Sequence, residues 1–230
     1  MQKDLAPQQR TYESSLTRDE VRRAIYIDFE GFADQAPTLI GYSFDQRFIQ
    51  VVFDRALEPA ASAKGLSVQD SQVVVARLWG RAKYERRRIV AFSQFDKNLS
   101  LDKLGVDLSP VYADARLIAR KWLGRLKGCH PDWKHKHPNW EIERGLKNFL
   151  DLIGYHRPRH LGIEKTTSRI LAVRDQLIKR RSFDKLTAVA KAKWTKLLDH
   201  NRHDVLGMIE LVTKAVDEFV PECISKIEAR

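Results

Sequence analysis

The chain has 230 residues, and 43% of them are hydrophobic, enough apolar side chains for the core of one or two globular domains. It has no apolar run of membrane-spanning length, no secretory signal in its polar N-terminus and only two cysteines, so we expect a cytoplasmic protein without a membrane partner or a disulfide framework. Lysine and arginine number 41 against 30 aspartates and glutamates, and this net charge of +11 favours a polyanionic partner such as nucleic acid.

The first quarter of the chain predicts the start of a sheet. We expect a flexible arm over 1–20, a single domain over 21–220 and a tail over 221–230. Three short segments rich in β-branched and aromatic residues predict strands over 24–29, 38–44 and 47–53. Only Asp45 and Gln46 separate the second strand from the third, which is the spacing of a hairpin. Residues 54–66 are expected to form a loop.

Helices and strands alternate through the middle of the chain. The pattern predicts a helix over 67–87 with Ser67 as its cap, a strand over 88–92, a helix over 95–105, a strand over 111–115 and a helix over 115–126. A helical crossover places the fourth strand beside the first and parallel to it. We therefore predict an α/β fold with a mixed five-stranded sheet of order 3-2-1-4-5, flanked by helices.

The second half of the chain is mostly helical. Helices are predicted over 141–154, 168–182 and 184–219, with loops over 128–140 and 157–168. The first loop contains residue types that bind zinc, namely Cys129, His130, His135 and His137, but their spacing fits no standard zinc motif. A polar loop is the preferred interpretation. Trp133 and Trp140 in the same loop would either stack on unpaired bases or anchor the loop.

Carboxylates stand where an apolar strand should end. In "AIYIDFEGF" (24–32), Asp28 and Glu30 project from one face of the first strand because side chains alternate. Asp96 follows the fourth strand, and parallel strands bring these ends together at the edge where open sheets bind ligands. Asp114, after the fifth strand, is expected to cap the next helix rather than to join the site.

A fourth acidic residue lies in the last helix. Asp204 falls inside the apolar arc of "LLDHNRHDVLGMIELV", and His200 is one turn earlier on the same side, whereas Asp199 and His203 are expected to face solvent. A buried carboxylate needs a partner or a cation. Four converging carboxylates suit two Mg²⁺ or Mn²⁺ ions, which would activate a water for phosphodiester cleavage, and His200 would orient or deprotonate that water.

These segments carry a resemblance. "YIDFEGF", "AFSQFDKNL" and "HNRHDVLGM" resemble the three sequential motifs of the DEDD superfamily of 3′–5′ exonucleases, which has the ribonuclease H-like fold, and the bacterial ribonuclease H-like branch in particular. The resemblance implies metal ligation by Asp28, Glu30, Asp96 and Asp204. The third motif departs from the family pattern, because His200 stands four residues before Asp204, where the family has Tyr at that distance or His at five.

The expected function is a metal-dependent nuclease that hydrolyses DNA or RNA, single-stranded or with a 3′ end, as a 3′–5′ exonuclease with two divalent cations. Catalysis is assigned to Asp28, Glu30, Asp96, His200 and Asp204. Two alternatives remain open. One is a structure-specific endonuclease on the same fold, and the other is a nucleic-acid-binding module that has lost turnover, for which the unusual third motif is the main support.

Overall fold

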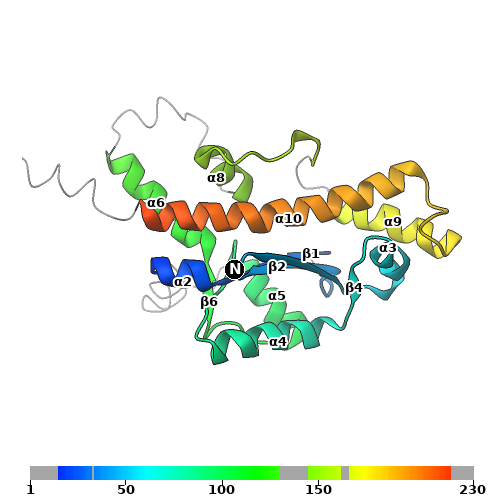
Figure 1. The fold of residues 1–230 in the computed structure, drawn as a ribbon, viewed down its shortest axis with the longest axis horizontal. Coiled ribbons are helices and arrows are strands. Elements are labelled where there is room, and N and C mark those ends of the chain that lie inside the picture. Colours follow the sequence, from blue (N-terminus) through cyan, green and yellow to red (C-terminus); the bar gives the residue numbers. More distant parts are fainter. Residues whose placement is uncertain (1–14, 33, 130–144, 162–165, 219–230) are drawn as a thin grey trace, which may run out of the picture.

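The computed structural model describes residues 15–32, 34–129, 145–161 and 166–218, in which one mixed sheet is flanked by helices (Figure 1). The strands are β1 (Ile25–Glu30), β2 (Leu39–Phe44), β3 (Arg47–Val52), β4 (Ser67–Val68), β5 (Ile89–Ala91) and β6 (Tyr112–Asp114). They lie in the order β4-β3-β2-β1-β5-β6. The β1–β2 and β2–β3 pairs are antiparallel, and the other three pairs are parallel.

The predicted five-stranded order is wrong, because a sixth strand stands at the edge. Ser67 and Val68, expected to begin a helix, instead pair in parallel with β3. The helix begins at Ser71, and its cap is Asp70, whose Oδ1 accepts a hydrogen bond from the Val73 amide at 2.9 Å. Asp70 is a stronger cap than a strand residue three positions earlier, since it reaches the first free N–H groups. The parallel pairing of β1 with β5 is confirmed.

The tight hairpin between β2 and β3 is confirmed. Asp45 and Gln46 both have positive φ, 49° and 62°, which is the backbone of the two-residue turn that matches the twist of antiparallel strands. On the other side of β2, which pairs with β1, Asp28 lies opposite Gly41. This pairing brings a glycine next to the first predicted site residue.

Helices cover both faces of the sheet. They are α2 (Arg18–Arg23), α3 (Glu58–Ser62), α4 (Ser71–Tyr84), α5 (Gln94–Leu104), α6 (Ala115–Cys129), α8 (Leu146–Ile153), α9 (Thr166–Arg180) and α10 (Ala188–Asp217), with 3-10 turns η1 (Arg55–Leu57) and η2 (Arg159–Leu161). Figure 1 shows α10 running across one face of the sheet and α4 and α5 on the other. At one end α9 packs beside α10, and the two helices form a hairpin that extends beyond the sheet.

Two further expectations need correction. The loop expected over 54–66 contains η1 and α3, because Asp54 caps the turn through the Ala56 amide and Pro59 stands in the first turn of α3, where it needs no N–H partner. The arm expected over 1–20 overlaps α2, whose Val21 is 4% exposed and belongs to the core. Residues 1–14 and the tail 221–230 lie outside the described residues. The single-domain boundary at 21–220 stays a prediction.

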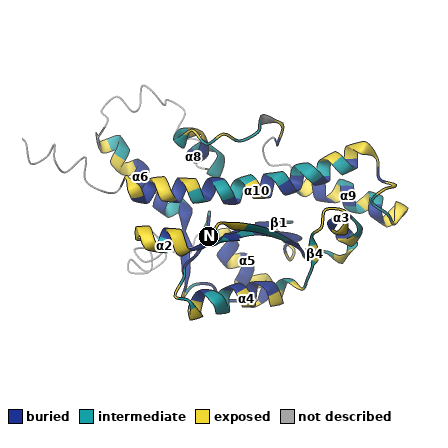
Figure 2. Cartoon of the chain, viewed as in Figure 1, coloured by how far each residue is buried: buried dark blue, intermediate teal, exposed yellow. Residues whose placement is uncertain are grey.

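The core has three clusters of buried apolar side chains. One lies between the sheet and α4 and α5, a second between the sheet and α6, α8 and α10, and a third joins α3 to the α9–α10 hairpin. Figure 2 shows buried residues on the strands and exposed residues on the outer surfaces of α2 and α4. Along the parts of the chain described here, no helix combines the length and apolar character that a membrane crossing requires.

Candidate active site

Strand β1 separates apolar from acidic side chains. Ile25, Ile27 and Phe29 pack into the cluster under α4 and α5. Asp28 and Glu30 project from the opposite face, toward α10, and Glu30 is only 7% exposed. The alternation of side chains along a strand produces this division without any loop. The carboxyl end of β1 therefore brings two carboxylates beneath the long helix.

Asp96 reaches the same edge from the N-terminus of α5. Ser93 caps this helix, its Oγ accepting from the Phe95 amide at 3.3 Å, and Asp96 stands in the first turn, where the positive end of the helix favours a carboxylate. Asp96 is 6% exposed and accepts backbone hydrogen bonds from the amides of Phe29 and Asp96 itself. These bonds tie the beginning of α5 to the end of β1.

Three predicted site residues form one compact group. Ligand atoms of Glu30, His200 and Asp204 all lie within 4.8 Å of one another. Asp28 and Asp96 are close enough that their charges disfavour ionisation of the group, but their oxygens are not part of that compact set. The structure thus brings all five residues to one end of the sheet and places three in direct reach of a common ion.

His200 links an arginine to Asp204. Arg157 Nη2 lies 2.6 Å from His200 Nδ1 and 3.3 Å from Asp204 Oδ1, and His200 Nε2 lies 3.3 Å from Asp204 Oδ2. Arg157 Nη2 also lies 3.2 Å from His200 Nε2, and because a guanidinium only donates, the ring nitrogen that it bonds carries no proton. Burial and the Arg157 charge lower the pKa of His200 to about 3. His200 is therefore neutral at physiological pH.

Asp28 is held by an asparagine that the sequence analysis missed. Asn201 is 0% exposed, and its Nδ2 donates to Asp28 Oδ2 at 2.8 Å and to the Asp28 carbonyl at 3.0 Å. Gln50 Nε2 donates in turn to Asn201 Oδ1 at 2.9 Å. A Cβ at Gly41 would lie 2.0 Å from Asn201 Oδ1, so only glycine leaves room for this side chain. The detectable signal was an asparagine at the centre of the apolar arc of α10.

Burial raises the pKa of every carboxyl in the cluster. Burial, and then the neighbouring carboxylates, hold the pKa of Asp28 well above its usual range and raise that of Glu30 to about 8. Burial raises the pKa of Asp96 to about 7 and that of Asp204 to about 6, although Arg157 opposes the change at Asp204. Four acids that resist ionisation together are a site that a cation would stabilise.

The loop end of α9 completes the wall around Glu30. Thr166 donates a side-chain hydrogen bond to Glu30, and Thr167 Oγ1 donates to the Gly31 carbonyl at 3.1 Å. Arg169, 5% exposed, favours the ionised form of Glu30 and donates to backbone carbonyls of Leu161 and Lys196. Neither Arg157 nor Thr166 carries a periodic signal in the sequence, since both lie at the edges of loops.

Of the remaining predictions from the sequence, one is confirmed, one is wrong, and others concern residues outside the described parts of the chain. Asp114 caps α6 as predicted, its Oδ1 accepting from the Leu117 amide at 2.9 Å. His203 does not simply face solvent, because its Nδ1 lies 2.9 Å from the Tyr155 hydroxyl and the two rings meet edge to face. The zinc alternative at Cys129 and the stacking role of Trp133 concern side chains outside the described residues, as do the histidines and Trp140 in that loop.

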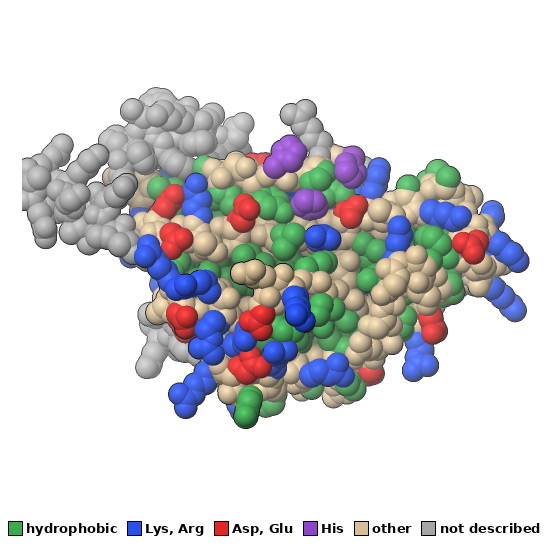
Figure 3. All heavy atoms as spheres, viewed as in Figure 1, with side chains coloured by type: hydrophobic (Ala, Val, Ile, Leu, Met, Phe, Trp, Pro, Cys, Tyr) green, Lys and Arg blue, Asp and Glu red, His purple; other side chains and the backbone are tan. Residues whose placement is uncertain are grey.

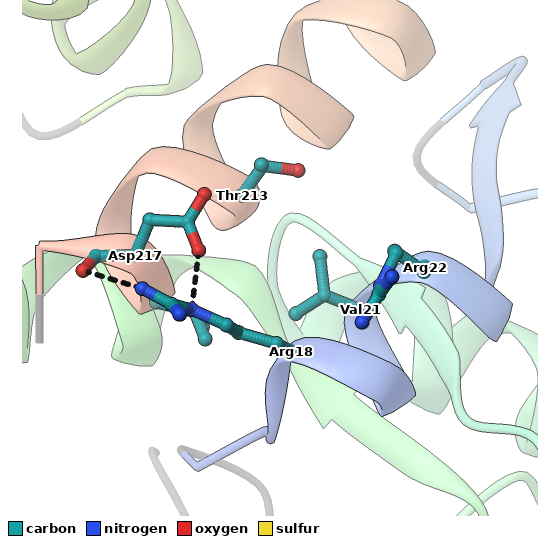
Figure 4. Close-up of a pocket in the computed structure, with 6 residues that line it drawn as sticks. Arg18, Val21, Arg22, Thr213 and Asp217 are labelled. Atoms are coloured by element: carbon teal, nitrogen blue, oxygen red, sulfur yellow. Dashed lines mark hydrogen bonds and ion pairs between the residues drawn. The ribbon is translucent and has the colours of Figure 1, made fainter. Parts of the chain in front are cut away.

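One cavity lies beside the acidic cluster, and another lies away from it. One of about 240 Å³ opens beside Glu30, with Phe32, Phe95 and Thr166 in its wall, and Phe95 is 53% exposed. Another, of about 600 Å³, lies between α2 and the end of α10 (Figure 4). Thr213 in its wall is more than two helical turns beyond Asp204. There Arg18 pairs with Asp217 at 2.7 Å, so the carboxylate among the described residues of this wall is already paired.

The donor set fits hard divalent cations. All four acids offer oxygen, which Mg²⁺ and Mn²⁺ prefer, and the neutral imidazole of His200 adds a nitrogen that Mn²⁺ accepts. No family model matches the chain, and no curated protein or solved structure matches it. A functional assignment therefore depends on the chemistry of this cluster.

Proposed function

We propose that this protein is a metal-dependent nuclease that hydrolyses phosphodiester bonds of DNA or RNA as a 3′–5′ exonuclease. The observation that carries the proposal is the gathering of Asp28, Glu30, Asp96 and Asp204 at one end of the sheet, buried and with raised pKa values. Buried carboxylates without cations cost stability, and a binding site for cations explains their presence. The resemblance to DEDD exonucleases implies the same activity, with a ribonuclease H-like arrangement extended by the edge strand β4.

The four carboxylates would hold two divalent cations, Mg²⁺ or Mn²⁺. Bound at a phosphodiester, such ions supply an activated water and stabilisation of the leaving oxygen. The chain's own contribution is to position the ligands. Asn201 orients Asp28, Thr166 orients Glu30, and the amides at the start of α5 orient Asp96.

His200 and Arg157 act beside these ligands in our proposal. In the described arrangement Arg157 Nη2 lies within hydrogen-bond distance of both ring nitrogens of His200. His200 accepts a proton from water only after Arg157 leaves the imidazole, and a phosphate oxygen is a strong alternative acceptor for a guanidinium. Substrate binding would thus free the imidazole while Arg157 holds the phosphate.

The cavity beside Glu30 supports a nucleotide substrate. Its volume of about 240 Å³ and its aromatic wall, with the half-exposed ring of Phe95, suit the flat face of an unpaired base. The net charge of +11 adds attraction for a polyanion.

The test uses single-stranded DNA and RNA labelled at the 5′ end, with Mg²⁺, with Mn²⁺ or with EDTA. We expect products shortened stepwise from the 3′ end, only with metal, and abolished by Asp28→Asn. Asp102→Asn is the matched control, because Asp102 is an exposed aspartate of α5. Full activity of Asp28→Asn would show that the site lies elsewhere.

A circular single strand separates the remaining possibilities. An exonuclease leaves it intact, because it offers no end, whereas cleavage of the circle would identify an endonuclease. If neither nucleic acid is cut with either metal, the enzyme proposal fails. Salt-sensitive binding without cleavage would then identify a nucleic-acid-binding module.

A further inference from the structure

The α9–α10 hairpin carries a large excess of positive charge. Residues 166–196 contain nine lysines and arginines against two aspartates, a net of +7, whereas the whole chain has +11. Figure 3 shows Lys and Arg side chains at the end of the molecule that this hairpin forms, and also over the rest of the visible face. A charge run on a solvated helix usually has acids interspersed, and here they are nearly missing.

Most of these charges have no acidic partner. Among the residues that the structure describes, no carboxylate pairs with Lys179, Arg181, Lys185, Lys193 or Lys196. This differs from two arginines on the opposite side of the sheet, which neighbouring acids neutralise. There Arg81 and Arg87 both bond Glu85 and Asp45. The unpaired charges of the hairpin remain available to a polyanion.

The basic surface is continuous with the acidic cluster. On α10, Lys193 and Lys196 lie at helical spacing from His200 and Asp204, so the four residues form one stripe along the helix. Arg169 of α9 bonds the Lys196 carbonyl and favours the ionised form of Glu30. The stripe therefore leads along α10 from Lys193 into the site.

We propose that the α9–α10 hairpin is the surface on which the sugar–phosphate backbone lies as a nucleic acid enters the acidic cluster. The inference deepens the proposed function and rests on it for the chemistry at the cluster, but it concerns binding rather than cleavage. Charge complementarity selects the occupant, since unpaired lysine and arginine side chains in a row bind successive phosphates.

The geometry sets a length for the bound strand. From Ala188 to Asp204, α10 rises about 24 Å at 1.5 Å per residue. At 3.4 Å per nucleotide this distance corresponds to about seven nucleotides of a strand in helical geometry. Affinity should rise with length until a strand reaches the turn of the hairpin and change little beyond it.

The experiment measures binding by fluorescence anisotropy in EDTA, with labelled single strands of about 4 and about 12 nucleotides, of DNA and of RNA. The hairpin variant is Lys179→Gln with Arg181→Gln and Lys185→Gln. We expect its affinity for the longer strand to fall at least about tenfold at low salt, and its salt slope to become shallower by about 2, since three phosphate contacts at about 0.7 each are lost. A second variant, Lys193→Gln with Lys196→Gln, tests the part of the stripe nearer the cluster.

The matched control neutralises three exposed basic residues of α4, its C-terminal turn and α5: Lys83→Gln with Arg86→Gln and Lys103→Gln. It removes the same charge from the opposite side of the sheet and should bind like the wild type. Wild-type affinity and salt slope in both hairpin variants, or an equal loss in the control, would overturn the inference. The proposed function is judged separately: cleavage with unchanged binding rejects only the hairpin, and hairpin-dependent binding without cleavage rejects only the nuclease.

Discussion

The two faces of strand β1 differ in what their side chains do. On one face Ile25, Ile27 and Phe29 are buried among apolar side chains of α4 and α5. On the other face Tyr26 is still core, but Asp28 and Glu30 follow it under α10, in a cluster of acids with raised pKa values. One face lowers the free energy of the folded chain, and the other raises it. Because side chains alternate along a strand, one face of β1 stabilises the fold and the other carries the acids of the candidate site.

The largest expected effect comes from removing a charge on the acidic face. Glu30→Gln should lower metal-dependent cleavage by roughly a thousandfold, about 4 kcal/mol of transition-state stabilisation. It should also raise the melting temperature in EDTA at pH 8 by about 4 °C, since a charge that repels its neighbours is gone. Calorimetry and a cleavage assay on the same preparation measure both. Glu210→Gln, an exposed glutamate of α10, should change neither. A Glu30→Gln protein that is less stable and equally active would show that Glu30 serves stability and not cleavage.

A truncation on the apolar face of β1 should lower stability and leave cleavage unchanged. Ile27→Ala removes a side chain that is 1% exposed and should cost about 2–5 kcal/mol of unfolding free energy, from lost burial and the cavity left behind. Urea denaturation measures the loss. Cleavage per folded molecule should stay near the wild-type value, because Ile27 points away from the acids. A selective loss of cleavage in a well-folded Ile27→Ala protein would mean that the two faces are not separable.

The close packing of Gly41 against Asn201, which holds Asp28, tests how tightly the acidic face of β1 is packed. Gly41→Ala alone should destabilise the protein by about 1–3 kcal/mol, because its Cβ would meet Asn201 Oδ1 at 2.0 Å. In an Asn201→Ala background the clash is removed, so the same change should cost at least about 1 kcal/mol less. A double-mutant cycle by urea denaturation measures this coupling. Additive effects would show that Asn201 moves aside freely.

The smallest effect is the pH dependence of stability in EDTA. Glu30, with a pKa of about 8, and Asp96, at about 7, keep protons in the folded state that the unfolded chain has already released. The folded state therefore binds more protons, and unfolding free energy falls as the pH rises from about 6.5 to 8.5. His200, with a pKa of about 3, changes stability in the opposite sense but only below about pH 6.5.

Melting temperatures across this window test the sign. We expect a decline of a few degrees in EDTA, roughly 2–4 °C per kcal/mol for a domain of this size. Mn²⁺ should remove the decline, because a cation favours the ionised carboxylates. A stability that rises with pH in EDTA would contradict the raised pKa values.

Local pattern accounts for most of the elements. Alternation identified β1 and its two acids, the two-residue spacing identified the β2–β3 turn, and the left-handed Gly105 ended α5 where the sequence placed it. Helical periodicity identified α10 and the unusual position of Asp204 inside its apolar arc. Strand β4 was missed, because two residues carry no period, and their pairing is decided by the exposed edge of β3.

By itself the sequence determined which residues carry charge, which faces they occupy, and that carboxylates stand at strand ends where burial penalises them. Only the tertiary structure decided how they meet. It brought Asn201 against Asp28, Arg157 against His200, and Arg169 of α9 against Lys196 of α10. The reason is physical: periodicity reports on one element at a time, whereas these contacts join elements whose distance in space depends on how the whole core packs.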